Sequence, residues 1–245
     1  MTLQSKVALV TGASRGIGRT IAERLADDGA SVVVNYHPTE RRDAEDVVRG
    51  IQRAGGSAVA APADIADAAQ LRGLFDVAET KFGHLDIVVL NAANARHGTI
   101  VDHSDEQFDA IFATNVRSAF IALREAAIRL PDGGRIVAIS AGLTRMPRIG
   151  TGVYAASKAA VDHLVRVLAQ EVGARGITAN SVLPGAVLTQ ALLNAGQAVI
   201  DAEVANTPLG RVGQPEDIAD VVRFLVSEQG RWVTGQMIGA GGGMF

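Results

Sequence analysis

Tyr154 and Lys158, within the stretch Val-Tyr-Ala-Ala-Ser-Lys, form a pair whose residue types suit acid–base chemistry. They lie four residues apart, so in a helix their side chains share one face, with about 5–6 Å between the Cβ atoms. A free tyrosine titrates at about pH 10, and a nearby cation lowers the pKa of its phenol. The pair is therefore expected to exchange a proton with a substrate hydroxyl or carbonyl. The alternative is an ordinary exposed pair on a helix surface.

The elements that position this pair follow from the hydrophobic pattern. Apolar runs of strand length alternate with longer amphipathic segments, which is typical of βαβ units and a parallel sheet. The predicted strands are residues 6–11, 31–36, 57–61, 85–90, 135–140, 177–183 and 236–239. The predicted helices are residues 17–28, from about 40 to the glycines at 55 and 56, 67–82, 104 to about 130, a helix carrying Tyr154 to about 172, and one beginning at 214–217. Without repeats or linkers, a single domain over residues 1–245 is expected.

The composition excludes several classes of protein. Hydrophobic residues make up 48% and charged residues 20%, and the formal net charge of −3 argues against a nucleic-acid partner. No apolar run is long enough to span a bilayer, so we expect a soluble cytoplasmic protein with no membrane partner. The chain has no cysteine, and its five histidines show no metal-ligand spacing, so no metal site is expected.

A glycine-rich stretch, Thr11-Gly-Ala-Ser-Arg-Gly-Ile-Gly18, lies between the first predicted strand and the first predicted helix. This is where a doubly wound sheet binds phosphates. Glycines let the backbone approach a pyrophosphate, and amides at the helix N-terminus stabilise its charge. The stretch therefore predicts a dinucleotide site, the alternative being a glycine-rich turn that binds nothing.

With these motifs together, the chain resembles the short-chain dehydrogenase/reductase family over nearly its whole length. The Thr11–Gly18 loop has the form of that family's cofactor loop, and Tyr154 and Lys158 match its Tyr-x-x-x-Lys motif. Asn115 matches its helix-borne asparagine, and residues 184–189 match its nicotinamide-side segment. The pattern is similar to that of ketoacyl-carrier-protein reductases and naphthol reductases. The resemblance implies an α/β fold, a Rossmann-type doubly wound parallel sheet of about seven strands in the order 3-2-1-4-5-6-7 with helices on both faces.

The resemblance also implies a role for each matched residue. Tyr154 is the acid or base, and Lys158 lowers the pKa of Tyr154 and holds the nicotinamide ribose. Asn115 holds a water in a proton relay, or is only a structural residue of its helix. Thr189 bonds the carboxamide, or caps a helix. The implied cofactor-binding residues are Gly12, Ser14, Arg15, Gly16, Ile17, Gly18, Tyr36, His37, Thr39, Asp64, Ile65, Asn91, Ala92, Tyr154, Lys158, Pro184, Gly185, Val187 and Thr189.

The chain departs from the family pattern next to the expected catalytic centre. The family carries a serine or threonine thirteen residues before the tyrosine, and here that residue is Ala141. The preceding Ser140 can supply the hydroxyl only if the following loop absorbs one residue. If no hydroxyl is supplied, the loss of one such donor costs about 10²–10³ in rate. Smaller departures are Ala93 in place of a glycine and Gly241 in place of an aspartate.

Charge favours NADP(H) over NAD(H) as the cofactor. An NAD enzyme of this architecture has an acid at the end of the second strand, whereas an NADP enzyme needs cations for the 2′-phosphate. Tyr36 occupies that place, so no carboxylate repels the phosphate. Arg15, His37 and Thr39, with Arg41 or Arg42, are candidate phosphate ligands. The alternative to phosphate binding is that Arg15 is only a solvated charge and that Thr39 only caps the next helix.

These inferences predict an NADP(H)-dependent carbonyl reductase, reversible as an alcohol dehydrogenase, acting on a small molecule. Two alternatives remain: an NAD-linked alcohol or sugar dehydrogenase, and a catalytically weakened nucleotide-binding sensor, which Ala141 motivates. We expect residues 94–99, 143–151 and 187–207 to form the walls of the substrate pocket. Arg145 and Arg148 flank this pocket and could bind an anionic substrate. His97 and His103 are expected to be loop or cap residues and not catalytic ones. Alanine-rich faces of the helices at 105–130 and 154–172 predict a homo-oligomer, a dimer or tetramer.

Overall fold

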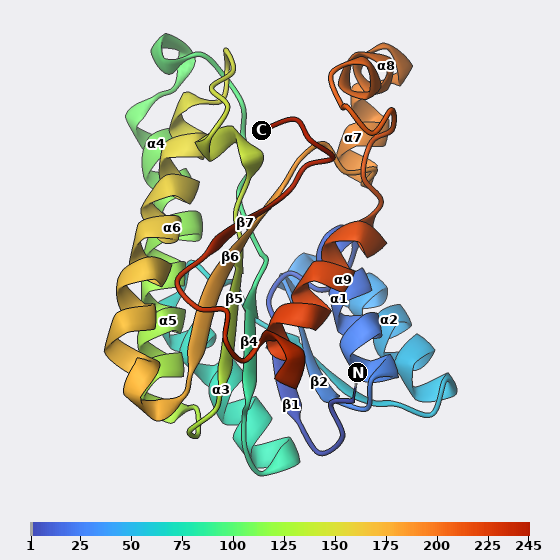
Figure 1. Ribbon diagram of the computed structural model, residues 1–245, viewed down its shortest axis with the longest axis vertical. Coiled ribbons are helices and arrows are strands. Elements are labelled where there is room, and N and C mark those ends of the chain that lie inside the picture. Colours follow the sequence, from blue (N-terminus) through green and yellow to red (C-terminus); the bar gives the residue numbers. More distant parts are fainter. Residues whose placement is uncertain (1) are drawn as a thin grey trace.

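A seven-stranded sheet runs through the centre of the protein in the computed structural model, which describes residues 2–245 (Figure 1). The strands are all parallel and follow the order β3-β2-β1-β4-β5-β6-β7. They are β1 (Val7–Val10), β2 (Ser31–Tyr36), β3 (Ser57–Pro62), β4 (Ile87–Leu90), β5 (Arg135–Ile139), β6 (Thr178–Pro184) and β7 (Met237–Ala240). The predicted fold class and strand order are confirmed.

Helices cover both faces of this sheet (Figure 1). They are α1 (Gly16–Asp27), α2 (Arg41–Arg53), α3 (Ala68–Phe82), α4 (Asp105–Phe112), α5 (Ser118–Arg129), α6 (Gly152–Val172), α7 (Gln190–Ala195), α8 (Gln197–Ala205) and α9 (Pro215–Val226). One core packs α3, α5 and α6 against the sheet, and a second core packs α1, α2 and α9 against the other face. The two cores bury the β-branched residues of the central strands on both sides, as a parallel sheet requires.

Local sequence signals set several helix starts. The Asp67 side chain accepts hydrogen bonds from the backbone of Ala69 and Gln70 and caps α3. Ser104 and Gln107 form the predicted capping box at the start of α4. Pro215 opens α9, where its missing N–H would have no partner in any case.

The helix predicted from residue 104 to about 130 is not regular. It divides into α4 and α5 around a π-helical turn, Ala113–Arg117, which contains Asn115. A π-turn inserts one extra residue per turn, and such turns are frequent at functional sites. The helical spacing of apolar residues in the sequence does not reveal this insertion, because the apolar pattern continues across it.

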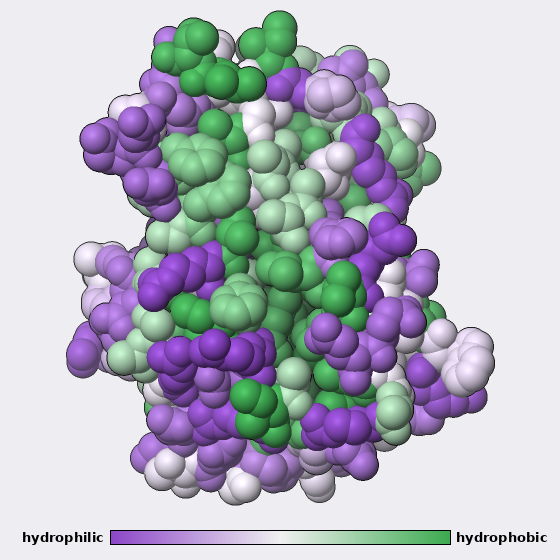
Figure 2. All heavy atoms as spheres, turned by 90° about the vertical axis from the view of Figure 1, so that its left-hand side faces the viewer, coloured by the Kyte–Doolittle hydropathy of each residue, from purple (hydrophilic) through white to green (hydrophobic). Residues whose placement is uncertain are grey.

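The outer face of α4, α5 and α6 carries apolar side chains among polar ones (Figure 2). Phe108, Phe120, Ile128 and Val167 are each between 43% and 69% exposed there. Among residues 2–245, no helix is both long enough and apolar enough to cross a membrane.

Candidate active site

The predicted site residues gather at the carboxyl ends of β1, β4, β5 and β6. The strand order reverses between β1 and β4, and in open α/β sheets the ligand crevice lies at that point. The turn from β1 into α1 holds Gly12 and Gly16 at φ of 61° and 55°, in the left-handed region that favours glycine. A Cβ at Gly18 would lie only 2.4 Å from the Asn91 side chain, so a larger residue would not fit.

Two segments after the strands support this glycine turn. The Asn91 amide donates to the carbonyl oxygens of Thr11 and Gly12, at 3.0 Å each, and fixes the turn from the end of β4. A Cβ at Gly16 would lie 3.5 Å from the Thr189 methyl group, so the turn adjoins the segment after β6. Pro184, Gly185, Val187 and Thr189 line one pocket with Ile17 and Asn91. The predicted phosphate-side and nicotinamide-side residues therefore form one continuous crevice.

The region expected to bind the 2′-phosphate contains a carboxylate that the sequence prediction missed. Glu40 pairs with Arg15 at 2.7 Å and accepts a hydrogen bond from the Ser14 hydroxyl at 2.6 Å. Tyr36 is buried at the end of β2, and the His37 ring bonds the Thr39 hydroxyl at 2.8 Å. The sequence shows an acid four residues after Tyr36, which could have suggested this carboxylate. Its position beside the glycine turn, however, depends on the short 3-10 turn Pro38–Glu40.

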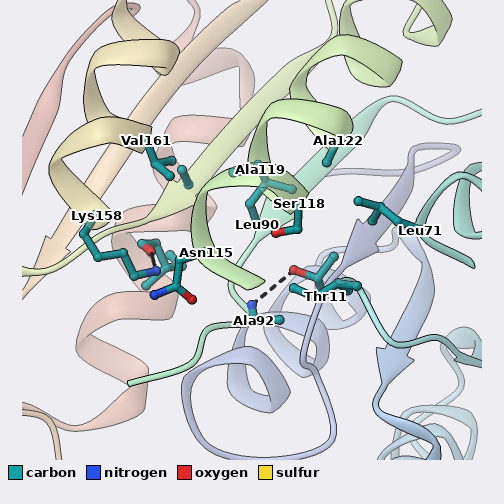
Figure 3. A pocket seen from close by; sticks show the side chains of 13 residues that line it. Thr11, Leu71, Leu90, Ala92, Asn115, Ser118, Ala119, Ala122, Lys158 and Val161 are labelled. Atoms are coloured by element: carbon teal, nitrogen blue, oxygen red, sulfur yellow. Dashed lines mark hydrogen bonds between the residues drawn. The ribbon is translucent and has the colours of Figure 1, made fainter. Parts of the chain in front are cut away.

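The remaining predicted adenosine-side residues follow β3 and β4. The Asp64 carboxylate accepts from the backbone of Ala66 at 2.9 Å, which orders the turn after β3. Ile65 is buried beside it. The Ala92 amide donates to the Thr11 hydroxyl at 3.1 Å, which holds the end of β4 against β1 (Figure 3).

Tyr154 and Lys158 lie on the same side of α6, as the spacing predicts, with the Lys158 ammonium 6.0 Å from the phenol ring. Lys158 is buried and donates to the Ile139 carbonyl oxygen at 2.7 Å. Burial raises the pKa of Tyr154 to about 12. In this arrangement the ammonium is directed at the Ile139 carbonyl oxygen and burial dominates the pKa of Tyr154, so the lowering of that pKa by Lys158 stays a prediction.

Asn115 holds the neighbouring loop in place. Its amide group donates to the Asn94 carbonyl at 3.0 Å and to the Ser157 hydroxyl at 2.9 Å, and its oxygen accepts from the Asn94 amide at 2.8 Å. Asn115 and Lys158 line a small cavity of about 20 Å³ (Figure 3). A cavity of about 10–15 Å³ is enough for one water.

Ser140 lines a pocket with Tyr154 and Lys158, and its catalytic role stays a prediction. Its hydroxyl is buried and faces the Asp162 carboxyl from the end of β5, while Ser181 faces the same carboxyl from β6. None of these groups makes a well-aligned hydrogen bond among the described residues. Burial raises the pKa of Asp162, and the nearby hydroxyls and Lys158 act in the opposite direction. Ala141, the next residue, is the one that lies thirteen residues before Tyr154.

Tyr154 opens into a pocket of about 760 Å³ that is mainly apolar. Its walls come from the three predicted segments, and from Met244 and Phe245, which sequence reasoning missed because nothing local links them to the site. Arg148 also lines the pocket but is paired with Glu203 of α8, and Arg145 donates to the Met237 carbonyl oxygen. Neither arginine is therefore arranged to receive an anionic substrate.

His97, from the segment after β4, lines this pocket and is exposed to solvent. Its ring centre is 5.8 Å from that of Tyr154, and the two rings are inclined at 53°. His103 instead bonds the Thr99 carbonyl oxygen at 2.9 Å, in agreement with a loop role.

Comparison with known proteins places this geometry among related enzymes. A family model described as enoyl-(acyl carrier protein) reductase matches residues 12–245. A versicolorin reductase from Emericella nidulans is 42% identical, over 99% of this chain and 97% of its own length. A short-chain dehydrogenase from Burkholderia cenocepacia, solved in complex with NADP, is 40% identical and superposes with a TM-score of 0.95 over 100% of this chain and 99% of its own.

A third relative extends the likeness to a named ketoreductase. An angucycline C-6 ketoreductase with bound NADP is 38% identical, with a TM-score of 0.94 over 99% of this chain and 96% of its own. The two solved relatives superpose over nearly the whole chain, which includes all seven strands of the sheet. The chain therefore belongs to the short-chain dehydrogenase/reductase family of oxidoreductases.

Proposed function

We propose that this protein is an NADPH-dependent carbonyl reductase, reversible as an alcohol dehydrogenase, with Tyr154 as its acid and base. The observation that carries the proposal is the position of Tyr154 above buried Lys158, in a pocket continuous with the glycine turn. A titratable phenol in a large apolar pocket is a candidate for proton transfer to a bound carbonyl.

The residues of the crevice fit a nicotinamide dinucleotide. The glycine turn presents backbone amides at the start of α1, where a pyrophosphate is stabilised. Thr189 makes no side-chain capping bond to α7, so its hydroxyl is available to a carboxamide. When bound, NADPH supplies a hydride to the carbonyl carbon. Arg15 supplies a cation at the adenosine end, and solved relatives bound to NADP support this cofactor.

Tyr154 donates its phenolic proton to the carbonyl oxygen as that oxygen gains charge. Lys158, next to it on α6, stabilises the phenolate that remains and is positioned to hold the ribose hydroxyls. Asn115 and Lys158 border the water-sized cavity, so a water there can return a proton toward the site. These assignments combine the family resemblance with the geometry of α6 and the π-turn.

The lining of the pocket supports an apolar ketone as the substrate. The volume of about 760 Å³ includes the nicotinamide side of the crevice as well as the space beside Tyr154, and most lining side chains are apolar. The Arg148–Glu203 pair joins the loop after β5 to α8 on opposite walls of the pocket. It adds no net charge, in agreement with a neutral substrate.

Two observations support the alternatives. The Glu40 carboxylate beside Arg15 favours an NAD-linked dehydrogenase, because a carboxylate binds a free ribose hydroxyl and repels a phosphate. The buried Ser140 hydroxyl and Ala141 favour a nucleotide sensor with little catalysis.

We also propose that the chain folds as one domain and that copies of it associate through the apolar face of α4, α5 and α6.

The first experiment compares NADPH and NADH binding by fluorescence, and then follows oxidation of the preferred cofactor with α-tetralone, β-tetralone and phenanthrenequinone. We expect tight NADPH binding and turnover of at least one ketone. Tyr154→Phe should retain NADPH binding and lose about 10²–10⁴ in kcat, because the proton donor is removed. Tight binding without turnover of any ketone would favour the sensor, and preference for NADH would favour the dehydrogenase.

A further inference from the structure

No serine or threonine hydroxyl of the loop after β5 is free beside Tyr154 in the part of the chain that the structure describes. Ala141 carries no hydroxyl, and the Ser140 hydroxyl is buried against Asp162 although Ser140 lines the pocket. Thr144 and Thr151 donate their hydroxyls to the carbonyl oxygens of Ala141 and Arg148, at 3.0 Å and 2.8 Å. A second donor to the carbonyl oxygen of a bound ketone would therefore come from another segment of the pocket.

His97 comes from the segment after β4, which borders the loop before α6, and it is available to a ligand. Its ring is in contact with that of Tyr154 and lines the same pocket. The side-chain hydrogen bonds within residues 94–103 involve Asn94, Thr99 and His103, and none of those among the described residues involves the His97 ring. A neutral imidazole carries one N–H donor, and a protonated one carries two.

The fold fixes the segment that carries His97 at both ends. Asn94 exchanges two hydrogen bonds with the Asn115 side chain, of 2.8 Å and 3.0 Å, which attaches it to the π-turn. Gly98 donates to the Gly150 carbonyl oxygen at 2.8 Å, which attaches the other end to the loop before α6. Only three residues lie between these anchors, so the position of His97 follows from the scaffold that also positions Tyr154.

We infer that His97 is a catalytic residue that donates a ring N–H hydrogen bond to the substrate carbonyl oxygen, in place of the hydroxyl missing at position 141. The inference rests on the proposed carbonyl reduction. The oxygen still receives its proton from Tyr154, and His97 keeps its own proton throughout. Because the oxygen gains negative charge during the reaction, this hydrogen bond strengthens in the transition state and therefore raises kcat.

The test is a double-mutant cycle between His97 and Ala141, measured with whichever of the three ketones is reduced fastest. His97→Phe keeps a flat ring without a donor and should lower kcat by about 10²–10³. NADPH affinity, measured by fluorescence, should change less than about twofold, which also shows that the variant is folded. Adding Ala141→Ser to His97→Phe should restore activity by about tenfold or more, because serine supplies a donor from the end of β5.

Two further variants separate donation from shape. His97→Gln retains a side-chain N–H and should lose less activity than His97→Phe. His163→Phe is the matched control, because His163 is exposed on α6 and outside the pocket, and it should behave as the unaltered protein.

Distinct results overturn the inference and the proposed function. If the unaltered protein reduces a ketone and His97→Phe does so at an equal rate, the inference is overturned while the proposed function stands. If His97→Phe is slow but still binds NADPH, and adding Ala141→Ser does not restore its activity, then the inference that the His97 hydrogen bond replaces a hydroxyl at position 141 is overturned. If the unaltered protein reduces none of the ketones, the proposed function fails and the role of His97 with it.

Discussion

Lys158 and Asp162 are the two charged residues whose interaction matters most at the scale of single side chains. Burial lowers the pKa of Lys158 to about 8, and Asp162, four residues later on α6, acts to raise it. Lysine is a cation only below its pKa, and the cation is the form that stabilises a Tyr154 phenolate. Asp162 thereby acts as a positioning residue, through Lys158 and not through the substrate.

The Asp162→Asn variant should therefore lose reductase activity at lower pH than the unaltered protein. Without the carboxylate the pKa of Lys158 falls below about 8, so the cation disappears earlier as the pH rises. We expect the alkaline fall in kcat/KM to move down by about one pH unit, since a nearby opposite charge shifts a pKa by about 1–3 units. The pH profile with a fixed ketone measures this shift. An unchanged profile with full NADPH binding would mean that the buried carboxyl is neutral.

At the scale of elements, the turn before α1 and the 3-10 turn after β2 together determine which adenosine ribose fits. Arg15 and Glu40 come from these two turns and pair at 2.7 Å. A 2′-phosphate at this place would compete with Glu40 for the Arg15 guanidinium. We therefore propose that the preference between NADPH and NADH depends on the opposed charges of Arg15 and Glu40 on these two turns.

Variants of this pair should change NADPH binding in opposite directions. Arg15→Ala should weaken NADPH binding by about tenfold, the value of one hydrogen bond to a charged group, and leave NADH binding nearly unchanged. Glu40→Gln should strengthen NADPH binding, because the competing charge is removed while the side chain keeps its size. Fluorescence titration with both cofactors measures these effects. Arg19→Ala, on the exposed side of α1, is the matched control. A larger loss of NADH binding than of NADPH binding in Glu40→Gln would instead identify Glu40 as a ribose ligand.

At the scale of the whole molecule, the apolar face of α4, α5 and α6 should join copies of the chain. Phe120 and Val167 are 48% and 44% exposed, and association would remove them from water. We expect solution scattering at micromolar concentration to give the mass of a dimer or tetramer. Val167→Lys should lower that mass, because it places a charge within the contact. A monomeric mass for the unaltered protein would contradict the proposed association.

The sequence by itself determined the order of the seven strands and the side of α6 that carries Tyr154 and Lys158, but it predicted neither α7 nor α8 nor the division of α4 from α5. These features follow from local periodicity, from glycine at turns and from helix caps, each of which acts over a few residues. The family resemblance extended them to the strand order and to the crevice between β1, β4 and β6. The predicted capping box at Ser104 and the glycine turn at Gly12 are examples in which a local signal was sufficient.

Only the tertiary structure decided how the side chains of the proposed active site point. The Ser140 hydroxyl faces Asp162 because the end of β5 lies against β6 and α6, and Lys158 bonds Ile139 for the same reason. His97 reaches Tyr154 because Asn115 and Gly150 hold the two ends of its segment. These contacts join residues far apart in the chain, and their geometry depends on packing between layers. No local pattern in the sequence carries that information.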